Sequence, residues 1–61
     1  MEDLSLVEAM KRLPDRERHI IDMRFFEGKT QTEVAKEIHI SQAQVSRLEK
    51  SALKSMRNYL N

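Results

Sequence analysis

The 61-residue sequence contains no cysteine and no tryptophan, and it has only one glycine and one proline. Without cysteine, disulfides and thiolate metal sites are excluded, which fits a reducing cytoplasm, where we expect this chain. The scarcity of glycine and proline leaves little turn chemistry for a β-sandwich or barrel. No apolar run approaches a membrane span, and no signal peptide is recognisable. A chain this short cannot enclose a large substrate cavity beside its core, which argues against an enzyme with a small-molecule substrate.

Residues that favour helices are abundant instead, namely Ala, Leu, Glu, Lys, Arg, Met and Gln. Pro14 ends a first helix and opens a second, and Gly28 lies where a left-handed C-terminal cap is needed. In the second helix we expect Ile20, Ile21 and Phe25 to face the core. The apolar spacing predicts helices over about 4–12, 15–27, 31–38 and 42–59. We therefore expect an all-α fold, a compact four-helix domain that covers residues 1–61.

The last two expected helices form a helix-turn-helix, because a tight turn separates two capped helix starts. Thr30 and Glu33 have the form of a capping box, and Ser41 and Gln44 repeat it. His39 occupies the turn position where a positive φ is needed and glycine is common. We predict that it adopts the left-handed conformation, at a cost of about 1 kcal/mol. The six positions that close the small core of this motif are all apolar: Val34, Ala35, Ile38, Ile40, Val45 and Leu48.

The net charge is only +1, but positive charge gathers towards the C-terminus. If Val45, Leu48, Ala52 and Met56 face inward, the basic residues of the last helix share its outward face, with Glu49 at the edge. Such a cationic face suits a polyanion, although charge alone leaves a plain solvated face equally open. These basic residues are Arg47, Lys50, Lys54 and Arg57.

The second helix of a helix-turn-helix enters the major groove of DNA. Arg47 has the forked geometry that matches guanine, and Gln42 and Gln44 match adenine, although Gln44 is also a capping partner. Lys54 is expected at phosphates, with simple solvation as the alternative. The start of the preceding helix suits a phosphate as well as a cap. The expected DNA-contacting residues are Thr30, Gln31, Gln42, Ala43, Gln44, Ser46, Arg47, Lys50 and Lys54.

Several segments of the chain resemble region 4 of bacterial sigma factors, and the likeness is closest to the sporulation type of the late forespore. They are residues 13–18 (LPDRER), 23–31 (MRFFEGKTQ), 33–35 (EVA) and 40–50 (ISQAQVSRLEK). His39 departs from the family, which usually has glycine there. The resemblance covers almost the whole chain.

The resemblance implies a protein that acts in transcription initiation in sporulation without catalysing a reaction. Its last helix would recognise the −35 promoter element, and an apolar surface would dock on the flap-tip helix of the RNA polymerase β subunit. Anti-sigma proteins are further partners that the resemblance implies. Because nothing here corresponds to a region that reads the −10 element, we expect a domain of a longer protein.

Two other classes of function stay open. The first is a protein-docking module bound by an anti-sigma regulator, in which exposed apolar residues form a partner surface instead of completing the core. Those residues are Leu4, Met23, Phe26 and Leu60, and for each of them a place in the small core is an equally open alternative. The second is the DNA-binding domain of a response-regulator-type activator, which shares an Arg-Glu-Arg run before an apolar helix. No cofactor or metal is expected, because His19 and His39 lack companion ligands, and no nucleophile–base pair suggests an enzyme.

Overall fold

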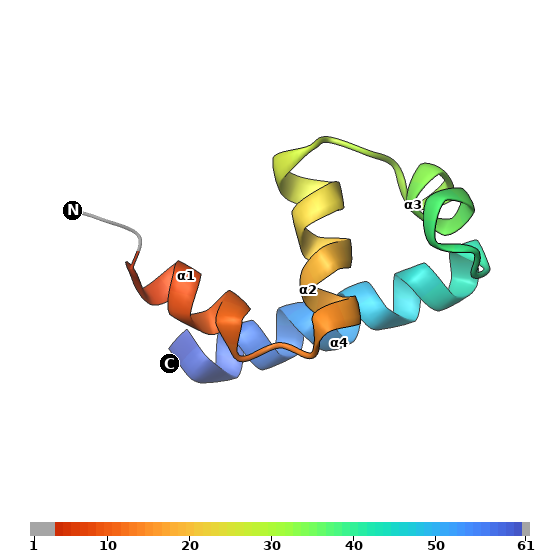
Figure 1. Ribbon diagram of the computed structural model, residues 1–61. Coiled ribbons are helices and arrows are strands. Elements are labelled where there is room, and N and C mark those ends of the chain that lie inside the picture. The colour runs from red at the N-terminus through yellow and green to blue at the C-terminus, as the bar shows by residue number, and fades with distance from the viewer. Residues whose placement is uncertain (1–3, 61) are drawn as a thin grey trace.

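Helix α4 (Gln42–Leu60) is the longest element, and the other helices are arranged along it (Figure 1). The computed structural model describes residues 4–60. In that range α1 (Leu4–Lys11), α2 (Asp15–Ile21) and α3 (Gln31–Ile38) each contact α4, and a π-helical turn, η1 (Asp22–Phe26), continues α2. Figure 1 shows α1 beside the C-terminal half of α4 and α3 at its N-terminal end, with α2 between them. The predicted all-α, four-helix fold is confirmed.

Local signals fix the helix-turn-helix formed by α3 and α4. The Thr30 hydroxyl oxygen accepts a hydrogen bond from the Glu33 N–H at 3.1 Å, and the Glu33 carboxylate accepts one from the Thr30 N–H at 2.8 Å. Ser41 caps α4 by accepting from the Gln44 N–H at 3.0 Å. His39 adopts the predicted left-handed conformation, with φ of 63° and ψ of 45°. The two caps therefore start α3 and α4, and the left-handed His39 ends α3, so that only three residues separate the two helices.

The second helix differs from the continuous α-helix expected over 15–27. Its last turn widens in η1, where the Glu27 N–H donates to the Asp22 carbonyl, five residues earlier, at 3.1 Å. This wider turn changes which side chains face inward after Ile21. Met23, which the docking alternative placed on the surface, is completely buried, whereas Phe25, expected in the core, is 53% exposed. The surface position for Met23 and the core position for Phe25 were both wrong.

Two apolar clusters make up the core, because α4 is long enough for separate helices to cover its two halves. The first lies between α1, α2 and the C-terminal half of α4, and contains Ala9, Leu13, Ile21, Ala52 and Met56. The second lies where α2 and η1 pack on the helix-turn-helix and contains Ile20, Met23, Val34, Ala35 and Val45, with Ile38, Ile40 and Leu48 packed against it. All six apolar positions predicted for the motif are therefore in this second cluster. The long Met23 side chain reaches it from η1 and fills it.

Candidate nucleic-acid interface

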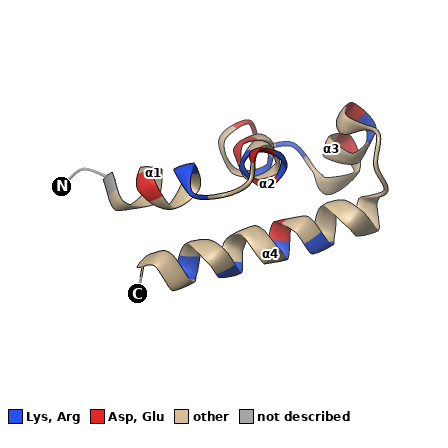
Figure 2. Ribbon diagram, turned by 60° about the horizontal axis from the view of Figure 1, so that its bottom comes forward, with Lys and Arg blue, Asp and Glu red and all other residues tan. Residues whose placement is uncertain are grey.

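The outward face of α4 carries four exposed basic side chains, Arg47, Lys50, Lys54 and Arg57. Figure 2 shows the basic residues spaced along the helix, with an acidic residue, Glu49, among them. None of the four takes part in an ion pair within residues 4–60, whereas Lys11, Arg18, Arg24 and Lys29 are all paired. The four cations are therefore available to an external anion. At 1.5 Å per residue, Arg47 and Arg57 are about 15 Å apart along the helix axis.

Glu49 does not lie at the edge of this cationic face, as the sequence analysis expected. Its side chain turns inward, and the residue is only 8% exposed. There it pairs with Arg24 of η1, whose Nε lies 2.7 Å from Glu49 Oε1. The physical reason is that a guanidinium in η1 offers the carboxylate a partner inside the fold, so burial leaves no unpaired charge. The cationic face of α4 is consequently free of its one acidic side chain.

The ionised state of Glu49 is favoured by its surroundings. Burial acts to raise the pKa of this carboxyl, but the hydrogen bonds from Arg24 and Gln31, together with the charge of Arg24, outweigh burial and hold the pKa below its usual value. Arg24 is itself fixed, because its Nη1 donates to the Lys29 carbonyl at 2.9 Å. The pair therefore joins η1, the loop before α3 and the middle of α4.

The spacing of α4 contains a signal that would have revealed the inward position of Glu49. Residues 45, 49, 52 and 56 recur at intervals of four, three and four, and all are buried. This is the regular pattern of an inward helix face, and the charge of Glu49 hid it. Leu48, which the sequence analysis placed on that face, lies beside it and is half-buried.

The start of α3 lies against the start of α4, which brings together most of the residues expected to contact DNA. Gln42 donates from Nε2 to Oε1 of Gln31 at 2.5 Å. Thr30 directly precedes Gln31 and is exposed. Gln42, Ala43, Arg47 and Lys50 are exposed, while Gln31, Gln44 and Ser46 are half-buried. Lys54 is exposed but lies about 18 Å along the helix from Gln42.

The residues expected to bind a protein partner do not form one surface. Met23 belongs to the core, so it offers nothing to a partner that binds the folded chain. The side chain of Leu4 lies outside what the structure describes. Phe26 and Leu60 are 62% and 47% exposed.

Phe26 lines an apolar groove of about 230 Å³ between α1, the end of α2 and α4. Leu60 is not among the residues that form it, which are Leu6, Met10, Ile21, Phe25, Phe26, Leu53 and Met56. The exposed positions of Phe25 and Leu53 were not predicted from the sequence. Leu53 lies three residues before Met56, and this spacing places it beside a core residue. The exposure of Phe25 follows from the wide turn η1 and has no local signal in the sequence.

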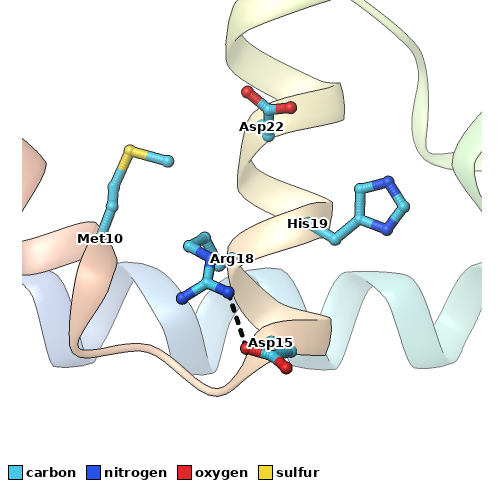
Figure 3. A pocket seen from close by; sticks show the side chains of 5 residues that line it. All are labelled: Met10, Asp15, Arg18, His19 and Asp22. Carbon is cyan, nitrogen blue, oxygen red and sulfur yellow. Dashed lines mark hydrogen bonds and ion pairs between the residues drawn. The ribbon is translucent and has the colours of Figure 1, made fainter.

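A second hollow, between α1 and α2, is lined by Met10 and by four polar or charged residues, Asp15, Arg18, His19 and Asp22 (Figure 3). In it Arg18 Nη2 lies 2.6 Å from Asp15 Oδ1, and the imidazole of His19 points away from α1. Within residues 4–60, no three acidic or histidine side chains come together in a way that could hold a metal ion. Nor is any helix of this range both long and apolar enough to cross a bilayer. The face of α4 is therefore the site with the clearest chemical character.

Comparison with known proteins places the sequence in a family. Residues 9–58 match the family model described as Sigma-70, region 4. The chain is 63% identical over 60 residues to the RNA polymerase sigma-G factor of Clostridium acetobutylicum, covering 98% of this chain and 23% of that protein. It is 66% identical over 56 residues to the sigma-G factor of Bacillus subtilis, covering 92% and 22%. The sigma-F factor of Bacillus licheniformis is 48% identical over 58 residues, covering 95% and 23%.

The chain thus spans less than a quarter of the length of these relatives. No solved structure matches it. The resemblance to region 4 that the sequence motifs indicated is confirmed, and this is not a family of enzymes. The chain belongs to the Sigma-70, region 4 family.

Proposed function

We propose that the protein binds the −35 element of promoters through α4 while it is docked on RNA polymerase, as part of a sigma factor that acts in transcription initiation during sporulation. The observation that carries the proposal is the row of four exposed, unpaired basic side chains on α4, from which Glu49 has been withdrawn. Family membership supports it, as do the names of the relatives, which are RNA polymerase sigma factors. Such a function belongs in the cytoplasm.

Two kinds of contact are expected along α4. Arg47 lies one and a half turns from the start of the helix, where side chains reach base edges, and its guanidinium matches the O6 and N7 acceptors of guanine. Lys54 lies two turns further and is expected to meet phosphates, which contribute affinity without sequence preference. The two roles predict different responses to substitution.

The experiment measures binding of the 61-residue chain to a duplex that the wild type selects from a randomised library, and to a scrambled duplex. Arg47→Ala should weaken binding to the selected duplex by about 1–3 kcal/mol and binding to the scrambled one much less. Lys54→Ala should weaken both alike and lower the slope of affinity against salt by about one. Lys11→Ala is the matched control, because it removes one exposed cation from α1. If all three variants behave alike, α4 is not the DNA-binding face.

Docking on polymerase is assigned to the apolar groove that Phe25 and Phe26 border. Both rings are more than half exposed, and a helix of a partner would cover them together with Leu53. We expect Phe26→Ala to reduce capture of a polymerase β-flap fragment while the far-ultraviolet circular dichroism stays unchanged. Tyr59→Ala, which alters an exposed aromatic outside the groove, is the control. An anti-sigma regulator that uses this groove would compete with the flap fragment.

A further inference from the structure

A chain of hydrogen bonds leads from the buried ion pair to the first residue of the DNA-facing helix. Arg24 Nε donates to Glu49 Oε1 at 2.7 Å, and Gln31 Nε2 donates to the same oxygen at 3.0 Å. The Oε1 of Gln31 then accepts from Nε2 of Gln42 at 2.5 Å. The hydrogen bonds join three elements, namely η1, α3 at its first residue, and α4 at its start and its middle.

The charge of Glu49 sets the direction of every bond in this chain. An ionised carboxylate can only accept hydrogen bonds, so Gln31 must turn its NH₂ group towards Glu49. The carbonyl oxygen of Gln31 then points towards Gln42, and it can only accept. Gln42 must consequently present its own NH₂ group to Gln31. The two amide orientations, which are free in an isolated glutamine, are both fixed by the buried ion pair.

This orientation leaves Gln42 with the groups that recognise adenine. A glutamine reads adenine through its carbonyl oxygen, which accepts from the N6 amino group, and one N–H, which donates to N7. Gln42 uses one of its two amide hydrogens on Gln31, so its Oε1 and its second N–H remain available. Its side chain is also held at one end before DNA arrives, so less rotamer freedom is lost on binding.

We propose that Gln31 is a specificity-determining residue that positions the Gln42 amide for an adenine at one place in the bound DNA. The inference rests on the proposed function, since it concerns how α4 reads a base. In this proposal Gln31 positions Gln42 and does not itself contact a DNA phosphate. Both its carbonyl oxygen and one of its amide hydrogens are engaged inside the protein, and its side chain is half-buried.

The test is a double-mutant cycle on base preference. Gln31→Met keeps the length of the side chain and removes both bonds, and Gln42→Ala removes the reader. Each protein is titrated with the duplex that the wild type selects and with versions in which each base pair is replaced in turn. The wild type should prefer adenine at one position by about 5-fold or more, which is the lower end for a bidentate contact. Gln42→Ala should abolish that preference.

Gln31→Met should reduce the same preference at least threefold and leave the guanine preference that depends on Arg47 unchanged. The double variant should match Gln42→Ala alone, because Gln31 acts only through Gln42. If Gln31→Met keeps the adenine preference while Gln42→Ala loses it, the positioning role is wrong and the proposed function stands. Uniform weakening of all duplexes by Gln31→Met would instead mean that Gln31 contacts phosphate, which also overturns the inference.

Two further measurements keep the inference testable, one for the case in which Gln31→Met does not fold stably and one that does not depend on DNA binding. If Gln31→Met melts at a much lower temperature than the wild type, Gln31→Asn is used in its place. The shorter asparagine amide cannot reach Glu49 and Gln42 at the same time, so Gln31→Asn must also lose the adenine preference. The side-chain amide resonances of Gln42 test the geometry without DNA, and one of its two N–H protons should exchange slowly in the wild type and fast in the Gln31 variant. A wild type with no base preference at any position overturns the proposed function and this inference together.

Discussion

Replacing Arg24 with methionine should destabilise the fold strongly, because it leaves the carboxylate of Glu49 buried without its cation. Breaking a buried ion pair by removing one partner costs about 3–5 kcal/mol. The Arg24 and Glu49 side chains are 26% and 11% exposed, so solvent screens the pair slightly and the lower end, about 3 kcal/mol, is expected. A chain of 61 residues has a total stability of roughly 3–9 kcal/mol, so this single change removes a large part of it.

The pH dependence separates the loss of charge pairing from the loss of packing. In the wild type the pKa of Glu49 is lower in the folded state than its unfolded value of about 4.5. The ionised carboxylate therefore stabilises the fold fully above the unfolded pKa, and this stabilisation is lost as the pH falls through the folded pKa. In Arg24→Met the cation is missing and only burial and the hydrogen bond from Gln31 act on the Glu49 carboxyl, so its folded pKa rises. Protonation then removes the cost of burying an unpaired negative charge. The difference in stability between the two proteins should therefore shrink as pH falls from 7 towards 4.

The assay is urea unfolding followed by circular dichroism at 222 nm, at pH 7 and at pH 4, with Glu49→Met as the matched control. Glu49→Met removes the buried negative charge. Arg24 loses its partner, but its side chain is partly exposed, so water can solvate the remaining positive charge. It should cost less than Arg24→Met at pH 7 and show little change in that cost between the two pH values. A cost below about 1 kcal/mol for Arg24→Met, or a cost independent of pH, would refute the claim that this pair anchors the domain.

Substitutions at two turn positions should shift the midpoint of thermal unfolding in opposite directions. His39→Gly relieves a left-handed non-glycine residue at φ of 63° and should stabilise the fold by about 0.5–1 kcal/mol, which corresponds to a rise of roughly 2–8 °C in a domain of this size. A fall in the midpoint would show that the imidazole contributes more than the backbone strain costs. Gly28→Ala should lower the midpoint, because φ is 74° there; no atom lies within 4 Å of an added Cβ, so the cost of about 1 kcal/mol comes from the backbone alone. An unchanged midpoint would mean that this cap tolerates strain.

The helix-turn-helix could be predicted from the sequence because its signals are local. The capping box at Thr30, the left-handed residue at His39 and the apolar spacing from Val34 to Leu48 each depend on residues a few positions apart. Local chemistry and tertiary packing agree there, so the pattern was sufficient.

The parts that could not be predicted depend on contacts between distant segments. The pairing of Arg24 with Glu49 joins residues 25 positions apart, and only the fold brings them together. The wide turn η1 decides that Met23 is buried and Phe25 is not, and no residue in that turn signals it in advance. The hydrogen bond from Gln42 to Gln31 likewise requires the starts of two helices to meet.

The central claim is that the outward face of α4 and the start of α3 contact DNA. A titration of the ¹⁵N-labelled chain with the selected duplex, followed by backbone amide resonances, tests it most directly. The account predicts that the largest shifts fall on Thr30 and on the exposed positions from 42 to 54, and that the groove between α1 and α4 stays unchanged. Shifts concentrated on Phe25, Phe26 and Leu53, with the resonances of Arg47 and Lys50 unmoved, would contradict it.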